Sequence, residues 1–200
     1  MNYFIKKILL FVFSFDKYIL YKIFKFDSWH NQRIKGDNYC KCIYKYVNTE
    51  REGDDICEIG CGLGDIILNT KIKNKHCLDQ CTNVLRALKF ISKVKFQKVK
   101  IKQFNFLKET LPDKYDIIIL INWPHTVDPE LLNLKISEIF KNNLRCGGSI
   151  IIDTVSDKTY QFNHDITYLI SSLNCSIHKI SEHAMGRIIW DIQKSSLQNY

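Results

Sequence analysis

The sequence predicts an α/β domain built on a parallel sheet. From Asp55 onward, short apolar runs typical of strands alternate with segments typical of helices, and this alternation favours parallel strands joined by crossovers. Residues 117–121 and 149–152 are almost wholly apolar, as expected of central strands buried on both faces. With 200 residues, 46% of them hydrophobic, the chain can bury a core as one domain without disulfides or metals.

The elements can be placed in chain order from their periodicity and caps. Helical arms are expected over about 2–26, broken near Asp16, and a helix over 37–48 has Asp37 as its N-cap. Asp128 and Pro129 form an N-cap and first-turn pair for a helix over 129–143. The remaining strands are expected at 55–60, 75–79, 98–104, 115–122, 148–154 (after a tight link at 145–148), 175–181 and 187–193, and the remaining helices at 66–72, 83–91 and 163–173.

The formal net charge of +8 is only weak evidence for a nucleic-acid partner. The chain has 24 Lys and 5 Arg, whereas phosphate and base recognition relies largely on the forked guanidinium group. In the densest basic stretch, Lys98, Lys100 and Lys102 alternate with Val99 and Ile101. That pattern is typical of an edge strand whose outward lysines prevent edge-to-edge pairing, although it could also follow a phosphate backbone.

The first 26 residues are apolar, aromatic and basic. Their uninterrupted apolar run is far shorter than the roughly 18–20 residues of a spanning helix, and no small-residue cleavage site follows it. An amphipathic arm is expected, which either packs on the domain as a lid or lies in the plane of an anionic membrane. Its polar side is formed by Lys6, Lys7, Ser14, Lys17, Lys22 and Lys25.

The 8 cysteines predict free thiols in a cytoplasmic protein. They form no CxxC pair and no Cys/His cluster with zinc-binding spacing, so no metal is expected. Cys57 and Cys77 lie in apolar runs and are expected to be buried.

The segment from Glu58 to Asp65 carries the clearest chemical signal. It contains Gly60, Gly62 and Gly64, follows an expected strand and is expected to open a helix. A dinucleotide site would have a third glycine where Asp65 stands, and this carboxylate would repel a pyrophosphate. A ligand that carries positive charge, such as S-adenosylmethionine, escapes that repulsion.

On these residues the chain resembles the class I S-adenosylmethionine-dependent methyltransferases over roughly 37–193. The resemblance implies a single doubly wound, seven-stranded sheet of order 3-2-1-4-5-7-6, with the last strand antiparallel and a hairpin near Ala184–Gly186. It divides the chain into an N-terminal helical arm or lid at 1–36 and a methyltransferase domain at 37–200.

The resemblance also implies a cofactor site. The glycine-rich segment would contribute Glu58, Gly60, Cys61, Gly62 and Gly64. Asp79, at the end of the second strand, would accept hydrogen bonds from both ribose hydroxyls, with Gln80 beside it. Asn105 stands where the family usually has Asp, and it would bind the adenine amino group with Phe106 as a neighbour. Asn122 would complete the cofactor site.

In the family, the fourth strand ends at the methyl acceptor, which here corresponds to the loop Asn122-Trp123-Pro124-His125. His125 is the candidate base for a hydroxyl acceptor, although it could equally bond within the loop or cap the helix. Trp123 either walls the acceptor pocket or packs in the core. Trp29 and His30 could bind the acceptor from the lid, and His164 or His183 from elsewhere, but each also suits a packing role.

The expected reaction is methyl transfer to a hydroxyl of a small molecule or glycan precursor, as in bacterial surface-polysaccharide modification. The alternative is an N-methyltransferase that acts on RNA, DNA or protein through the lysine-rich surface. The Asn122–His125 loop also faintly resembles the Asn-Pro-Pro-Tyr loop of amino-group methyltransferases that act on adenine or glutamine, from which it departs at Trp123 and His125. A non-enzymatic scaffold is disfavoured by the intact Glu58, glycines and Asp79. The expected location is the cytoplasm, with peripheral contact at the inner membrane surface through 1–26.

Overall fold

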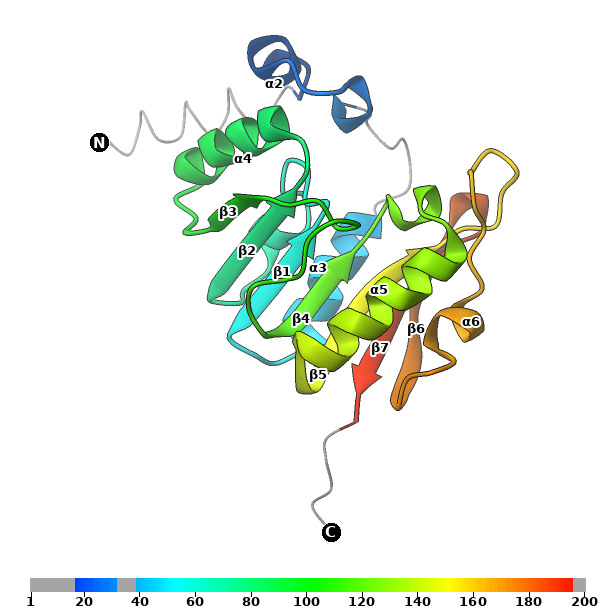
Figure 1. Ribbon diagram of the computed structural model, residues 1–200. Helices are drawn as coiled ribbons and strands as arrows, with labels where there is room; N and C mark the ends of the chain where they lie inside the picture. Colours follow the sequence, from blue (N-terminus) through cyan, green and yellow to red (C-terminus); the bar gives the residue numbers. More distant parts are fainter. Residues whose placement is uncertain (1–16, 32–38, 196–200) are drawn as a thin grey trace.

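A seven-stranded sheet forms the centre of the molecule in a computed structural model that describes residues 17–31 and 39–195 (Figure 1). The strands are β1 (Asp55–Ile59), β2 (Asn74–Asp79), β3 (Lys100–Gln103), β4 (Tyr115–Leu120), β5 (Leu144–Thr154), β6 (Cys175–His183) and β7 (Arg187–Lys194). The α-helices are α2 (Lys17–Phe24), α3 (Tyr39–Glu50), α4 (Thr82–Val94), α5 (Pro129–Asn142) and α6 (Ile166–Ile170). Short 3-10 turns are η1 (Ser28–Asn31), η2 (Ile67–Asn69), η3 (Pro124–Thr126) and η4 (Ala184–Gly186).

The strand order is β3-β2-β1-β4-β5-β7-β6, which confirms the order that the resemblance implies. The strands β1 to β5 pair in parallel, while β7 is antiparallel to both β5 and β6. The hairpin between β6 and β7 turns at Ala184–Gly186, as expected. Reversal of the strand order on either side of β1 and β4 places the carboxyl ends of these two strands next to each other, where ligands of such sheets bind.

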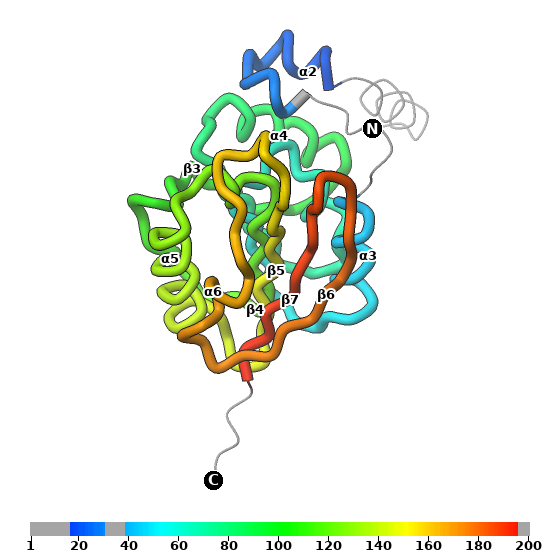
Figure 2. Tube along the Cα trace, turned by 90° about the vertical axis from the view of Figure 1, so that its right-hand side faces the viewer, coloured from blue at the N-terminus to red at the C-terminus, as the bar shows by residue number. Residues whose placement is uncertain are grey.

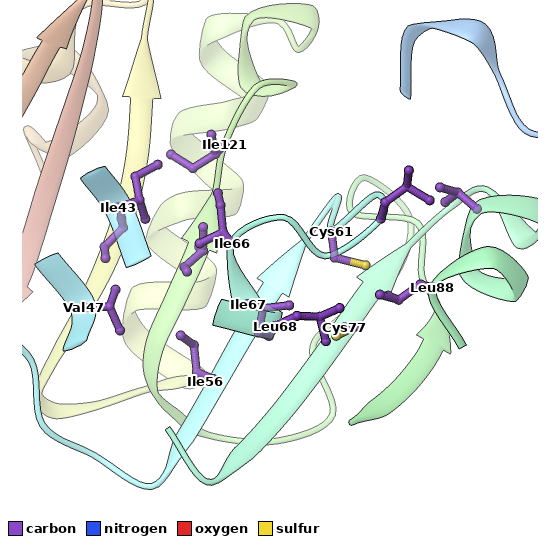
Figure 3. Packing of buried hydrophobic residues seen from close by; sticks show 14 of the residues in the cluster. Ile43, Val47, Ile56, Cys61, Ile66, Ile67, Leu68, Cys77, Leu88 and Ile121 are labelled. Carbon is purple, nitrogen blue, oxygen red and sulfur yellow. The ribbon is translucent and has the colours of Figure 1, made fainter. Parts of the chain in front are cut away.

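Alternate residues of the central strands pack into two separate hydrophobic cores, one on each face of the sheet. Ile56, Ile117 and Ile119 face the side covered by α3 and α4, which Figure 3 shows at close range. Cys57 and Ile118 face the other side, which is covered by α5 and α6. Because both faces are covered, the central strands are apolar at nearly every position, as the sequence pattern predicted.

Several local predictions are confirmed. The Asp128 side chain caps α5 by accepting hydrogen bonds from the backbone N–H groups of Glu130 and Leu131. Strand β3 lies at the edge of the sheet with its lysines exposed, while Val99 and Ile101 pack against the core. Cys57 and Cys77 are buried.

Other local predictions are wrong. The helix expected at 66–72 is reduced to η2, so the glycine-rich segment does not open an α-helix. The link expected at 145–148 belongs to β5, which begins at Leu144 and shifts register against β4.

Other predictions fall partly outside the described residues. Of the arms expected over 2–26, the described residues contain α2. The proposed caps Asp16 and Asp37 lie outside the described residues.

The helix α2 and the turn η1 lie beyond the carboxyl ends of the parallel strands, in both Figure 1 and Figure 2. Leu20 and Phe26 are buried there, and the Phe24 ring lies 5.9 Å from the Phe90 ring of α4. None of the helices in the described part of the chain has the length and apolar character needed to cross a bilayer. The burial of Leu20 and Phe26 shows that residues 17–31, the described part of the arm, pack on the domain at this end of the sheet.

Candidate active site

The segment after β1 is tied to the end of β2 by backbone hydrogen bonds. The N–H groups of Gly60 and Cys61 both donate to the carbonyl of Leu78, at 2.8 and 3.0 Å. Gly62 donates its N–H to Asp79 Oδ2 at 3.0 Å. Gly60, Gly62 and Gly64 all have positive φ angles, which explains why glycine occupies these positions.

The buried carboxyl groups of Asp79 and Glu58 hold the glycine loop and the turn after it through hydrogen bonds to backbone N–H groups. Asp79 Oδ1 accepts a second bond from the Cys81 N–H at 2.8 Å, so its carboxylate is fixed by the backbone on both sides. Glu58 Oε2 accepts a bond from the Ile67 N–H at 3.0 Å and thereby secures η2. Burial raises the pKa of Glu58 to about 8, so this side chain is protonated at neutral pH.

Side chains from η1 and from the loop after β4 lie close to two of the glycines. A Cβ at Gly60 would lie 2.3 Å from Trp123 Cδ1, and a Cβ at Gly62 would lie 3.2 Å from His30 Nδ1. The Trp123 Nε1–H donates to the Ile59 carbonyl at 2.7 Å, and its ring meets Phe106 edge-on at 4.7 Å. The loop after β4 and the turn η1 therefore both contact the glycine loop.

The turn η1 brings His30, with Trp29 stacked on it, to the glycine loop. The His30 ring stacks on the half-exposed Trp29 and is itself only 7% exposed. Burial lowers the pKa of His30, which keeps the imidazole neutral, although the nearby Asp79 carboxylate opposes this effect. The two residues were expected at the acceptor; the described structure places His30 against Gly62.

The expected adenine residues lie at the end of β3. Asn105 Oδ1 accepts bonds from the backbone N–H groups of Leu107 and Lys108, and so it already stabilises a local turn. Phe106 is buried beside Trp123. Gln80 is exposed, and its carbonyl accepts a bond from the Gln103 side chain. Phe106 therefore faces the centre of the site, whereas the Asn105 amide oxygen is committed to its own loop.

A buried ion pair lies beside the loop that follows β4. Arg187, at the start of β7, pairs with Asp153 of β5, and both side chains are almost fully buried. The same guanidinium group donates to Asn122 Oδ1 at 3.1 Å and to the Tyr160 hydroxyl at 3.2 Å. Asp153 Oδ1 accepts a bond from the Asn122 N–H at 2.9 Å. These bonds hold Asn122 at a φ of +73°, which turns the chain sharply at the end of β4.

His125 lies in η3, directly after this turn. Its ring packs edge-on against Tyr160 at 4.4 Å, and its Nδ1 is buried with no bonding partner among residues 17–31 and 39–195. Burial lowers the pKa of His125 to about 4, and the positive charge of Arg187 adds to this effect. The imidazole is therefore neutral at physiological pH, but it is a weak proton acceptor.

The structure separates the other expected histidines. His164 is buried and bonds through Nε2 to the Pro124 carbonyl at 2.9 Å, so it supports the loop after β4. His183 bonds Ser181 on β6 instead. Arg187 and Asp153 were not singled out from the sequence. Asp153 could have been noticed, because it is a charged residue at the carboxyl end of an apolar run.

Comparison with solved structures identifies this architecture. The N-methyltransferase NodS from Bradyrhizobium japonicum WM9, in complex with S-adenosyl-L-homocysteine, has 14% identity and a TM-score of 0.66, with 88% of this chain and 96% of NodS covered. Magnesium protoporphyrin IX methyltransferase (ChlM) from Synechocystis PCC 6803, with bound SAM, has 14% identity and a TM-score of 0.66, with 95% and 97% covered.

This chain has the fold of the class I S-adenosylmethionine-dependent methyltransferases. A third structure of the same kind is TehB from Haemophilus influenzae, with 12% identity, a TM-score of 0.61 and 84% of this chain covered; the match spans 65% of the length of TehB. No protein-family model matches the sequence, and neither does any curated protein. The likeness is therefore one of fold, and it confirms the architecture that the motifs imply.

The residues of the site fit an adenosyl group. The Asp79 carboxylate lies at the edge of the glycine loop, where it suits a cis-diol. Phe106 and Trp123 offer aromatic surface beside it. In the His30 ring, whose Nδ1 approaches Gly62, the other nitrogen, Nε2, is buried and has no partner within the described residues. Among those residues, no three His, Cys, Asp or Glu side chains gather as they would around a metal ion.

Proposed function

We propose that this chain transfers a methyl group from S-adenosylmethionine to a hydroxyl of a small molecule or glycan precursor. The observation that carries the proposal is the bond from Trp123 Nε1 to the Ile59 carbonyl. It joins the loop after β4, where the family binds its acceptor, to the glycine loop after β1. Cofactor and acceptor residues are therefore neighbours at one end of the sheet.

S-adenosylmethionine supplies the activated methyl group and its leaving group, so the protein mainly has to bind and orient. In this proposal Glu58, Gly60, Cys61, Gly62 and Gly64 shape the cofactor loop. Asp79 would hold the ribose, and Phe106 and Asn122 would contact the rest of the cofactor. Trp123 would exclude water from the space between cofactor and acceptor.

His125 is the proposed base for a hydroxyl acceptor. Its neutral imidazole is in the protonation state that a base requires, and it lies on the loop that follows β4. A base with a pKa near 4 accepts a proton poorly, so any rate gain depends on holding the acceptor hydroxyl in line.

Methyl transfer to nitrogen, on RNA, DNA or protein, is the second candidate. One observation favours a nitrogen acceptor: a neutral amine attacks through its lone pair and demands less of a base, and burial makes His125 a weak one. The name of NodS, an N-methyltransferase with this fold, agrees with that chemistry. Assays with hydroxyl and amino forms of the same acceptor scaffold distinguish the two candidates.

We place the protein in the cytoplasm with peripheral contact at the inner membrane surface, where glycan precursors for surface polysaccharides are assembled. Support for the contact comes from α2, whose outward face exposes Ile19 and Ile23 beside Lys22. Apolar side chains next to lysines suit the surface of an anionic bilayer.

Calorimetric titration with S-adenosylhomocysteine tests the cofactor proposal. The wild-type protein should bind, and Asp79→Ala should weaken binding at least tenfold, because a charge-assisted pair of bonds to the ribose is lost. Glu52→Ala, which removes an exposed carboxylate at the opposite end of the sheet, serves as the control and should leave the affinity unchanged. Absence of wild-type binding would reject the proposal.

Turnover of His125→Ala tests the base. We expect kcat to fall by about 10²-fold or more while the affinity for S-adenosylhomocysteine stays within twofold. His164→Ala is the comparison, since this side chain supports the same loop without facing the proposed acceptor. Wild-type turnover by His125→Ala on a hydroxyl acceptor would exclude a base role.

A further inference from the structure

The turn η1 covers the part of the proposed cofactor site that contains Gly62 and Asp79. Its neighbour Phe26 is 2% exposed and meets the His30 ring edge-on at 5.9 Å. His30 in turn lies over Gly62, whose N–H is bonded to Asp79. The arm thus covers the carboxylate that the ribose needs.

The arm is attached on both sides of the glycine loop. Lys17 forms a salt bridge with Asp65, at the end of that loop. On the other side, the Asn83 side chain of α4 donates to the Lys25 carbonyl at 3.1 Å. Two separate attachments fix the position of η1, so the placement of His30 follows from contacts outside the imidazole itself.

One ring nitrogen of His30 is without a hydrogen-bond partner in the described part of the chain. This atom is Nε2, and it is buried. A buried polar atom without a partner costs free energy, so its presence calls for an explanation. Stacking on Trp29 and edge contact with Phe26 hold the ring in one orientation.

We propose that His30 is a cofactor-binding residue supplied by the arm, and that its Nε2 forms a hydrogen bond with a ribose hydroxyl of the nucleoside held by Asp79. This inference rests on the proposed function and extends it, because it moves His30 from the acceptor to the cofactor. A neutral imidazole can donate to or accept from a hydroxyl, which suits either tautomer. Methyl transfer would then require the arm to be in place.

Titration with S-adenosylhomocysteine and its 2′-deoxy and 3′-deoxy analogues tests this contact. His30→Ala should weaken binding of the ribose ligand about five- to tenfold, the worth of one buried hydrogen bond. For one of the two deoxy ligands the same substitution should have no effect, because the bonding hydroxyl is already absent. His30→Gln, which retains a donor and an acceptor, should restore part of the affinity.

The control is Ile23→Ala, on the outward face of the same arm, which should bind all three ligands like the wild type. Equal losses for the ribose and both deoxy ligands in His30→Ala would mean that His30 only covers the site, and would overturn the proposal. Unchanged binding by His30→Ala would overturn it too. If the wild-type protein binds none of the ligands, the proposed function fails first.

Discussion

At the scale of single residues, Glu58 shows how burial changes the protonation state of a carboxyl group. The carboxyl group lies under the glycine loop, fully buried, and bonds the Ile67 N–H. Burial raises its pKa to about 8, well above the value of 4.5 for an exposed glutamate. Between these values the folded state holds a proton that the unfolded state has released, so stability falls as the pH rises through this range.

Glu58→Gln should remove this pH dependence. The amide keeps the shape of the side chain and the acceptor for Ile67, but it cannot ionise. We expect the variant to have a Tm several degrees above the wild type at pH 8.5 and nearly the same Tm at pH 5, at about 2–4 °C per kcal/mol for a domain of this size. Thermal unfolding followed by circular dichroism measures both, with the exposed Glu109→Gln as control. Equal Tm values at pH 8.5 would refute the protonated state.

At the scale of elements, the outward face of α2 exposes apolar side chains among the described residues. Tyr18, Ile19 and Ile23 are 51%, 45% and 61% exposed, while Leu20 packs inward. Lys22 lies on the same outward face. A helix that exposes aliphatic side chains between lysines on a folded domain suits contact with an anionic bilayer.

The variant Ile19→Glu/Ile23→Glu should reduce binding to anionic phospholipid vesicles at least tenfold, since it loses apolar burial and adds like charge. Co-sedimentation with anionic and zwitterionic vesicles provides the measurement. Leu134→Glu is the matched control, because Leu134 is 66% exposed on α5 and outside the arm. Equal sedimentation of wild type and double variant would remove the membrane contact from the proposal.

The connection after β1 shows what periodicity could not predict. Ile66, Ile67 and Leu68 are all buried, and three consecutive buried residues do not fit one face of a helix. Glu58 bonds the Ile67 N–H, and the chain returns to β2 after η2. The apolar run was visible in the sequence, but the tertiary contact that stops the helix was not. The α5 helix was predictable because its cap is local, at Asp128.

At the scale of the whole molecule, buried histidines should make the fold sensitive to acid. Burial is the main cause of the lowered pKa values of His30, His76 and His125. Below pH 6.5 these histidines bind protons in the unfolded chain but remain neutral in the folded chain. The free energy of unfolding therefore decreases as the pH falls. This effect runs opposite to that of Glu58.

We expect the Tm of the Glu58→Gln variant, which lacks the opposing titration of Glu58, to fall between pH 7 and pH 5 at constant ionic strength. A loss of roughly 1–2 kcal/mol, after allowing for solvent screening, corresponds to about 2–8 °C. Adding His125→Asn should reduce the slope, because it removes the histidine whose pKa burial lowers to about 4. A Tm of Glu58→Gln that stays constant over this range would contradict the neutral state of these side chains.

The α/β class was predictable from the alternation of strand runs and helix segments, whereas the order of the strands came from the resemblance of the glycine-rich segment and the segments after it to the methyltransferases. The site was predictable in part. The glycine loop and Asp79 lie together because each stands at the carboxyl end of one of two paired parallel strands. The pairing of Arg187 with Asp153, and the position of His30 over Gly62, join residues far apart in sequence, and no local pattern records such contacts.

The placement of the tryptophans gives the protein an optical reporter of its own. Of the 3 Trp residues, Trp29 stacks on the residue above Gly62 and Trp123 bonds the carbonyl before Gly60. The third, Trp190, bonds Thr154 on β5. Indole emission responds to polarity and contact, so a ligand that enters between the arm and the glycine loop changes the surroundings of two indoles at once. Trp29→Phe and Trp123→Phe would then separate, in a single unlabelled protein, the arrival of a nucleoside from the movement of the arm.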